Sequence, residues 1–517
     1  MRNGGIGSWP ARRARMSPGA VAVIGDDGVE ITYAALDERC RRTADVLEAW
    51  GVGRGDRVAY LGQNDPALYD VLFAATSLGA VFVPLNWRLA TPELAYIVGD
   101  CGAGLLVHAA DHAGPAAELA AGRDGLRAAG LDELAAAAAE APGRRRDEVI
   151  GLDEPAAIIY TSGTTGRPKG ATLTHGNITW NCVNVLIDTG LASTDRSLVC
   201  APLFHVAALN MISMPAFMTG GTVRVMAGFE PGAVLAEIER LGVTTMFGVP
   251  AMFAAMAQHP AWETTDLTCL TRALCGGAPV PLALIETYQQ RGIGFLQGYG
   301  MTEASPGALF MTAEQSRAKP GTAGVPQFFT DVRVVRSDGT DVEVGERGEV
   351  LVSGPNVMAG YWGLPDATAA AIDDGWFRSG DVATVDDDGF VTIVDRIKDM
   401  YISGGENVYP AEVEDALHAH PAVADCAVIG VADDRWGEAG RAVVVLRPGH
   451  DGDEAALLAH LDGRLARYKI PRSVHFVDEI PRSGAGKILK ELVRRDHGDT
   501  PENAHQEPSE LRGASHP

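Results

Sequence analysis

The stretch Tyr160-Thr-Ser-Gly-Thr-Thr-Gly-Arg-Pro-Lys-Gly170 decides how the rest of this chain is organised. The apolar run Ala156–Tyr160 leads into it and predicts a strand. Three glycines let the backbone turn tightly and approach an anion. Hydroxyl side chains and Lys169 supply hydrogen-bond donors and a positive charge. We therefore predict a phosphate-binding loop, with the candidate contacts Thr161, Ser162, Gly163, Thr164, Thr165, Gly166 and Lys169.

This loop differs from a Walker A motif. No glycine directly precedes Lys169, and Gly170 stands where that motif places the Ser or Thr that holds Mg²⁺. A surface linker rich in Gly, Ser and Thr is the ordinary alternative. That alternative does not explain the closing Pro168-Lys169-Gly170, so the loop indicates nucleotide chemistry of a different kind.

Strand-like and helix-like runs alternate on both sides of the loop. The helical pattern Ala67–Leu78 is one example, whereas the Ala-rich stretch Ala109–Arg146 is interpreted as exposed helix and linker. Alternation of this kind is typical of doubly wound parallel sheets, so we predict two α/β subdomains. The predicted strands are Arg57–Leu61, Ala80–Val83, Leu105–Val107, Ser197–Cys200, Thr222–Met226, Thr244–Val249, Arg272–Cys275 and Gly294–Gln297.

The sequence changes character after Asp331. The short strands Val332–Val335 and Glu349–Ser353 and a hairpin over Ala383–Val394 predict a small β subdomain. A compact unit of mixed helices and strands follows. We predict a nucleotide-binding N-terminal domain at residues 1–396, a small α+β domain at 397–495 and a disordered polar tail at 496–517.

Composition limits the classes of partner. The 517 residues suffice for about three domain-sized units, and the net charge of −24 disfavours binding to nucleic acid or to an anionic membrane. The seven cysteines are scattered without a C-x-x-C pair, which predicts reduced core thiols and a cytoplasmic protein. No apolar run reaches membrane-spanning length. Arginines before Pro18 leave weak peripheral membrane contact open, although a solvated terminus is the favoured interpretation.

Further motifs follow predicted strands. Pro202-Leu-Phe-His-Val206, Cys275-Gly-Gly-Ala-Pro279 and Gly298-Tyr-Gly-Met-Thr-Glu303 stand at the edge of the sheet where ligands of open α/β folds bind. Small residues there leave space for a flat purine. Taken alone, each has an ordinary explanation: a satisfied core histidine, a turn, a solvated charge. Later come Gly380-Asp381, the charged segment Asp395–Asp399, a double glycine at 404–405, and a glycine loop that carries Lys487.

Together, in this order, these motifs resemble those of the adenylate-forming superfamily, which includes acyl-CoA synthetases, peptide-synthetase adenylation domains and beetle luciferases. The resemblance covers roughly Ile31–Arg495 and is closest to bacterial fatty-acyl-CoA synthetases. It implies ATP, Mg²⁺ and coenzyme A as cofactors and an acid–thiol ligase as the activity. A hydrophobic carboxylic acid is adenylated with release of pyrophosphate and is then transferred to CoA.

The resemblance also implies a role for each matching residue. Lys487 is the catalytic lysine, Glu303 the Mg²⁺ ligand, and His205 lies beside the acyl pocket and gates it. Lys398 is the hinge about which the small domain turns. The adenine, phosphate, ribose and CoA contacts implied outside the first loop are Gly276, Gly277, Ala278, Tyr299, Gly300, Thr302, Asp381, Arg396, Gly404, Gly405 and Trp436. A half-buried packing role is the ordinary alternative for Trp436.

The acid itself stays open among fatty, aryl and polycyclic acids. Val206-Ala207-Ala208 stands where a peptide-synthetase domain normally has an Asp that pairs with an amino group, which disfavours amino acids. Three rival functions are an enzyme that passes acyl-AMP to a separate acceptor or carrier protein, a luciferase-like oxidoreductase, and an inactive binding protein. The intact Lys487, Glu303 and Asp381 disfavour the last of these. The oligomeric state, homodimer or monomer, is also left open.

Overall fold

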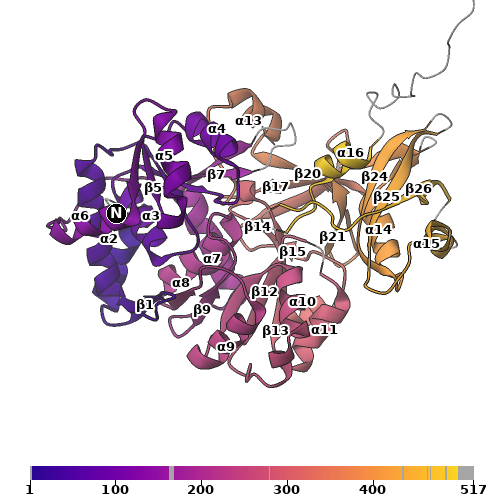
Figure 1. The fold of residues 1–517 in the computed structure, drawn as a ribbon, viewed down its shortest axis with the longest axis horizontal. Coiled ribbons are helices and arrows are strands. Elements are labelled where there is room, and N and C mark those ends of the chain that lie inside the picture. Colours follow the sequence, from indigo (N-terminus) through magenta and orange to yellow (C-terminus); the bar gives the residue numbers. More distant parts are fainter. Residues whose placement is uncertain are drawn as a thin grey trace, which may run out of the picture. The chain divides into compact units, whose positions relative to one another are not determined.

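The structure is a computed structural model, and it describes residues 3–161, 168–278, 280–396, 399–403, 406–433, 436–462, 464–465, 467–483 and 486–498. The chain forms two compact units (Figure 1). The N-terminal unit comprises Met1–Ser379 and Ala383–Ile393, and the C-terminal unit comprises Gly380–Val382 and Val394–Pro517. The predicted mixed α/β fold with a large first domain and a small second one is confirmed.

A seven-stranded sheet carries the signature loop. Its order is β18-β8-β7-β4-β3-β5-β6, and the pairs among β3 to β7 are parallel while β8 and β18 are antiparallel to their neighbours. Both faces of the parallel strands β3, β4 and β5 are largely buried, which explains why these strands appear in the sequence as continuous apolar runs. The strands are β3 (Arg57–Leu61), β4 (Val81–Leu85), β5 (Leu105–His108), β6 (Arg127–Gly130), β7 (Pro155–Thr161), β8 (Lys169–Thr174) and β18 (Gly360–Tyr361).

Two of the helices around this sheet, α2 and α3, begin at residues whose side chains cap them. Thr32 accepts a hydrogen bond from Ala35 N at the start of α2, and Asp65 accepts one from Ala67 N at the start of α3, where Pro66 is the first helical residue. The helices are α2 (Tyr33–Ala49), α3 (Pro66–Ser77), α4 (Thr91–Cys101), α5 (Ala113–Ala121) and α6 (Leu131–Glu140), with the short η2 (Ala110–His112).

The interpretation of Ala109–Arg146 as helix and linker alone was wrong, because this stretch also contains strand β6. Its sequence, Arg-Ala-Ala-Gly, lacks the β-branched residues that mark a strand. Parallel pairing with β5 forms it, so the tertiary context overrides weak local propensity. The arginines that follow are structural as well, since Arg144 Nε and Arg146 Nη2 bond Asp45 of α2 at 3.0 and 2.6 Å.

A nine-stranded sheet forms the second layer of the N-terminal unit. Its order is β15-β14-β13-β12-β11-β9-β10-β1-β2, with a parallel centre and antiparallel strands at both ends. Strands β1 and β2 come from the start of the chain and join this sheet beside β10. The strands are β1 (Val21–Ile24), β2 (Glu30–Thr32), β9 (Arg196–Val199), β10 (Thr222–Val225), β11 (Thr245–Gly248), β12 (Arg272–Gly276), β13 (Gly294–Gly300), β14 (Gly307–Met311) and β15 (Val325–Pro326).

The second sheet is accompanied by its own helices and followed by a small β sheet. The helical elements are α7 (His175–Thr189), the π-helix η3 (Ala208–Ser213), α8 (Met214–Thr219), α9 (Pro231–Leu241), α10 (Pro250–Gln258), η4 (Pro260–Glu263), α11 (Leu282–Gln290), η5 (Thr302–Ala304) and α12 (Ala313–Ala318). The small sheet, with helix α13 (Pro365–Ala371), consists of β16 (Asp331–Val335), β17 (Gly348–Ser353), β19 (Ile372–Asp373), β20 (Trp376–Val385) and β21 (Val391–Arg396). The predicted small β subdomain is confirmed.

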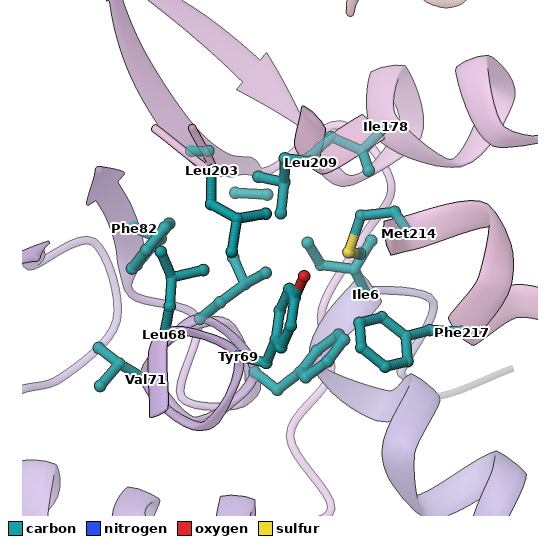
Figure 2. Packing of buried hydrophobic residues seen from close by; sticks show 14 of the residues in the cluster. Ile6, Leu68, Tyr69, Val71, Phe82, Ile178, Leu203, Leu209, Met214 and Phe217 are labelled. Carbon is teal, nitrogen blue, oxygen red and sulfur yellow. The ribbon is translucent and has the colours of Figure 1, made fainter. Parts of the chain in front are cut away.

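The largest apolar core joins the two α/β layers (Figure 2). Tyr69 of α3 and Phe217 of α8 make an edge-to-face contact with ring centroids 4.9 Å apart. The Tyr69 hydroxyl, buried with the ring, shares a 2.7 Å hydrogen bond with Ser213 Oγ. Such a ring pair adds about 0.5–1.5 kcal/mol to the burial of its area. This core therefore fixes the two layers against each other.

The N-terminal segment belongs to this core, so the prediction of a solvated terminus was wrong. Helix α1 (Trp9–Met16) and the turn η1 (Ile6–Ser8) bury Ile6 and Trp9. Ile6 N donates to His175 Nδ1 at 3.1 Å, and Arg13 donates to the carbonyl oxygens of Phe217 and Met218. Arg13, one of the arginines considered for membrane contact, thus forms hydrogen bonds within the protein instead.

The C-terminal unit is a second, separate core. Its five-stranded sheet has the order β23-β22-β25-β24, with β26 paired to β25. Helix α14 buries Glu414, whose carboxylate accepts from Val428 N at 2.7 Å and pairs with Lys490 at 2.9 Å. The elements are β22 (Tyr401–Ser403), β23 (Glu406–Val408), α14 (Pro410–His418), β24 (Val423–Asp433), β25 (Gly437–Leu446), α15 (Glu454–Leu461), η6 (Arg467–Lys469), β26 (Ser473–Phe476) and α16 (Lys490–His497).

Two predictions from composition agree with the structure. All seven cysteines are free thiols, and all but Cys269 are buried. Among the described residues, no helix is long and apolar enough to cross a bilayer. The predicted tail lies outside the described residues from position 499 onward.

Candidate active site

The signature loop connects two antiparallel strands. Strand β7 ends at Thr161 and β8 begins at Lys169, and these two residues are register partners. The loop is therefore a hairpin connection, whereas a Walker A loop leads from a strand into a helix. Of the predicted phosphate contacts, Thr161 and Lys169 are described. Ser162, Gly163, Thr164, Thr165 and Gly166 lie outside the described residues.

A tyrosine that the sequence analysis missed, Tyr361, contacts both Lys169 and Glu303. The ammonium nitrogen of Lys169 is 5.1 Å from the centroid of the Tyr361 ring, and the Tyr361 hydroxyl donates to Glu303 Oε1 at 3.0 Å. Burial, the charge of Glu303 and this hydrogen bond raise the pKa of the Tyr361 hydroxyl, so it remains a donor at neutral pH. A positive and a negative side chain, both predicted to face nucleotide phosphates, thus flank one neutral ring.

The two predicted adenine loops lie side by side. Gly276 at the end of β12 is the register partner of Gly298 in β13. A Cβ at Gly276 would come within 2.8 Å of Gly298 O, and Gly277 has φ 86°, so both positions need glycine. Gly277 and Ala278 are exposed, while Tyr299 and Thr302 are half-buried. The structure therefore brings these sequence-predicted residues to one edge of the sheet.

His205 follows the same sheet and holds a buried ring nitrogen. The imidazole is partly exposed, but its Nε2 is buried and has no hydrogen-bond partner within the described part of the chain. Burial lowers the pKa of His205 to about 4, and the positive charge of Arg88 adds to this shift. The ring is therefore neutral at pH 7. A π-helix, a feature frequent at functional sites, begins at Ala208 directly after this segment.

Buried asparagines hold the segment that carries Glu303. Asn356 Nδ2 donates to Ala304 O at 2.8 Å and to Gly307 O at 2.7 Å. Asn210 Nδ2 donates to Ser305 O at 3.1 Å, and Gly307 N donates to Asn181 Oδ1 at 3.1 Å. We call Asn181, Asn210 and Asn356 the asparagine frame. These hydrogen bonds come from buried side chains and reach four backbone groups between Ala304 and Gly307, so the frame fixes this turn of the chain.

The sequence offered one signal for the frame. Asn177, Asn181 and Asn184 repeat at helical spacing along α7, on the face that is buried. Polar residues on a buried helical face indicate an internal hydrogen-bond network. Asn356 and Tyr361 carried no comparable signal, because their partners are distant in the sequence.

The described candidate side chains of the C-terminal unit differ in their exposure to solvent. Lys487 is exposed on a turn, where Lys487 N donates to Ser483 Oγ at 3.2 Å. Trp436 is half-buried, with the Arg472 guanidinium 5.6 Å from its ring centroid, and Asp381 is buried in β20. The side chain of Arg396 and the residues Lys398, Gly404 and Gly405 lie outside the described residues.

The charged linker between the domains is anchored at both ends. Asp395 Oδ2 accepts from Ala411 N at 2.8 Å in the first turn of α14, and Asp399 pairs with Arg494 at 2.8 Å. A carboxylate is favourable at a helix N-terminus. These two aspartates therefore tie the segment to the C-terminal unit.

The residues present fit a magnesium ion that arrives with a nucleotide. No group of three or more His, Cys, Asp or Glu side chains among the described residues could enclose a metal. Mg²⁺ keeps several waters and is usually held by one or two carboxylates together with substrate phosphates. Glu303, a hard oxygen ligand that accepts from the Tyr361 hydroxyl, is therefore suited to this mode of binding and would hold the ion.

Comparison with known proteins defines the class. The chain matches the family model "AMP-binding enzyme" over residues 10–362 and "AMP-binding enzyme C-terminal domain" over residues 412–487. The protein therefore belongs to the AMP-binding enzymes, the adenylate-forming superfamily that its motifs resemble.

Individual relatives cover almost the whole chain. A feruloyl-CoA synthase from an Amycolatopsis species is 57% identical over 96% of this chain and 100% of its own length. The long-chain-fatty-acid–CoA ligase FadD13 of Mycobacterium tuberculosis is 38% identical over 96% of this chain and 99% of its own. The structure of an O-succinylbenzoate coenzyme A synthetase from Bacillus subtilis, in complex with ATP and magnesium ion, has a TM-score of 0.86 at 34% identity and covers 94% of this chain and 99% of its own.

Proposed function

We propose that this AMP-forming acyl-CoA ligase joins a hydrophobic carboxylic acid to coenzyme A in two steps. In the first, the acid's oxygen attacks the α-phosphate of ATP, an acyl adenylate forms and pyrophosphate leaves. In the second, the sulfur of CoA attacks the acyl carbon, a thioester forms and AMP leaves. The observation that carries the proposal is the cluster of Lys169, Tyr361 and Glu303 on β8, β18 and η5.

The first step needs charges that are already in place. A carboxylate is a poor acyl donor, and esterification to AMP removes its negative charge and provides a good leaving group. The protein contributes by holding anions in line and by stabilising charge on phosphate oxygens. We assign this work to Lys169, to Glu303 with the Mg²⁺ that it would hold, and to Lys487. Bound Mg²⁺ supplies positive charge to the phosphates.

Adenine, ribose and CoA are assigned to the remaining predicted residues. Gly276, Gly277, Ala278, Tyr299 and Gly300 would contact adenine, and Thr302 a phosphate, because these residues gather at the ends of β12 and β13. Asp381 and Arg396 would hold the ribose, and Gly404, Gly405 and Trp436 the CoA. Between the steps, the C-terminal domain would turn about Lys398.

Apolar side chains support a hydrophobic acid. Val206, Leu209 and Met211 near His205 are buried in the main core, and Phe247, Met252 and Met301 pack against it partly buried. These apolar side chains favour an aryl or alkyl chain over a charged one. The relative at 57% identity is a feruloyl-CoA synthase, so we propose an aryl-substituted acid of the ferulic type as the first candidate.

Product analysis tests the proposal. The protein is incubated with MgATP and one of four acids (ferulic, indoleacetic, palmitic or benzoic), with and without CoA, and the products are identified by mass spectrometry. We expect feruloyl-CoA and AMP when CoA is present and feruloyl-AMP when it is absent. Acyl adenylate that CoA does not consume would instead indicate transfer to a separate acceptor.

A further inference from the structure

One side chain contacts both charged groups of the proposed phosphate site. Tyr361 donates its hydroxyl hydrogen to the Glu303 carboxylate at 3.0 Å and presents its ring to the Lys169 ammonium at 5.1 Å. A cation above an aromatic ring is attracted to it, more strongly where water is excluded. Tyr361 therefore holds two opposite charges apart and orients both.

The backbone around Tyr361 is held on three sides. Strand β18 pairs with β8, so Tyr361 is the register partner of Ala171, and Trp362 N donates to Gly170 O at 2.8 Å. Tyr361 N donates to Thr368 Oγ1 at 2.9 Å. The ring therefore has a fixed origin, and its hydroxyl reaches Glu303 from a rigid base.

The main chain of Glu303 is held by the same segment. Met358 N donates to Glu303 O at 2.8 Å, and Asn356 Nδ2 donates to the carbonyl oxygens of Ala304 and Gly307. Residues Asn356 to Tyr361 thus fix both the backbone and the carboxylate of Glu303. A carboxylate held at only one of these points could rotate away from its ligand.

We propose that Tyr361 is a positioning residue for the nucleotide-bound magnesium ion, acting through Glu303. Its hydroxyl donates to Oε1 and thereby orients the carboxylate. Hydrogen-bond partners of metal ligands are typically worth about 10- to 100-fold in metal affinity. This inference rests on the proposed function, because it takes the nucleotide to be ATP.

Nucleotide binding without acid or CoA tests the role while no reaction takes place. Isothermal titration calorimetry measures the Kd of ATP with Mg²⁺ and, separately, with EDTA for the native protein and for Tyr361→Phe. We expect ATP to bind Tyr361→Phe about 10-fold more weakly with Mg²⁺ and equally well with EDTA. The melting temperature should not change, because the ring and its packing remain.

Two further variants make the result specific. Tyr288→Phe is the matched control. It removes a buried hydroxyl that donates to Phe253 O at 2.8 Å, in a different apolar core from the main one. Both Kd values should stay unchanged. Glu303→Gln should weaken Mg²⁺-dependent binding by itself, and adding Tyr361→Phe to it should have little further effect, since the tyrosine acts through Glu303.

Three results would overturn the positioning role: an equal loss for Tyr361→Phe in EDTA, no loss in Mg²⁺, or additive losses in the double variant. Failure of the proposed function gives a different result, because the native protein would then bind ATP neither with Mg²⁺ nor with EDTA.

Discussion

Two segments carry the charges assigned to adenylation, and the fold treats them differently. The segment around Glu303, residues 300–307, is held by the asparagine frame and by Met358 N, and its second half, residues 304–307, is buried. The turn that carries Lys487 is held by bonds within it, among them Ser483 N to Lys487 O at 2.7 Å, and by one surface ion pair of Arg482 with Asp425. The lysine itself is exposed.

This difference shows how an enzyme with two reaction steps can use a fixed residue for one task and an exposed residue for another. A residue assigned to hold a nucleotide-bound metal ion benefits from a fixed position, and the proposed ligand Glu303 lies in such a held segment. A lysine that serves one step gains from an exposed position on a short turn, because its flexible stem can be presented and withdrawn. The predictions below test this contrast, beginning with the largest effect.

Lys487→Ala should cause the largest loss. Removing one preorganised charged contact to a transition state typically costs about 10²- to 10³-fold in rate, so adenylation should slow by this factor. Transfer from supplied acyl-AMP to CoA should change less than about threefold, because the lysine acts in the first step. Quenched-flow measurement of each half-reaction compares the two. Lys319→Ala, which removes a surface partner of Asp386, is the matched control. Equal losses in both half-reactions would contradict the assignment.

Asn356→Ala should destabilise the Glu303 segment. It leaves two buried carbonyl oxygens, those of Ala304 and Gly307, without their donor, at about 1–3 kcal/mol each. We expect a total loss of about 2–6 kcal/mol in the free energy of unfolding of the N-terminal unit. Ser483→Ala, in the Lys487 turn, should cost less than about 1 kcal/mol. Urea unfolding followed by tryptophan fluorescence measures both, and similar losses would remove the contrast between the segments.

Acid should weaken the N-terminal unit through His175. Burial lowers the pKa of this histidine to about 4, below the ordinary value of 6.5, so the folded state binds the proton less tightly than the unfolded state. The contribution of neutral His175 to the free energy of unfolding is complete above pH 6.5. It is lost as the pH falls towards 4, and the loss amounts to about 2–3 kcal/mol by pH 4.5.

His175→Asn should therefore reduce the difference in unfolding free energy between pH 7 and pH 4.5 by about 2–3 kcal/mol. Urea titrations at pH 7 and at pH 4.5 measure this difference in unfolding free energy. A packing defect that lowers the unfolding free energy equally at both pH values does not affect the difference. The exposed His450→Asn should leave it unchanged. An unchanged difference in His175→Asn would show that this histidine is not buried neutral.

Trp436→Ala should have the smallest effect, confined to the second step. Loss of one aromatic contact is worth about 0.5–1.5 kcal/mol, so the KM for CoA should rise about 2- to 10-fold. The rate of pyrophosphate release without CoA should not change. Steady-state kinetics with varied CoA check this prediction, and a slower first step would place Trp436 with the adenylation residues instead.

Much of the fold was predictable because buried parallel strands are continuous apolar runs. Strand β3 coincides with the predicted Arg57–Leu61, and β9 to β13 lie within a few residues of their predictions. The order of the strands was not predictable. Strand β1 joins the second sheet although it precedes every strand of the first, since its pairing with β10 depends on contacts distant in sequence. The buried N-terminus was missed because arginines separate the few apolar residues there.

The candidate site likewise contains residues that could be predicted from the sequence and residues that could not. Motifs identified Lys169, Glu303 and the paired loops at Gly276 and Gly298, because their chemistry is visible in the residue types. Tyr361 was missed, since a tyrosine between Gly360 and Trp362 acquires its role only when β18 pairs with β8. The individual roles assigned to the site residues stay predictions.

The central claim is that adenylation and thioester formation are separate steps served by different residues. The most direct test is isotope exchange between pyrophosphate and ATP, measured with ferulic acid and without CoA. The account predicts acid-dependent exchange in the native protein and in Trp436→Ala, and strongly reduced exchange in Glu303→Gln and Lys487→Ala. Exchange that requires CoA, or that persists undiminished in Glu303→Gln and Lys487→Ala, would contradict it.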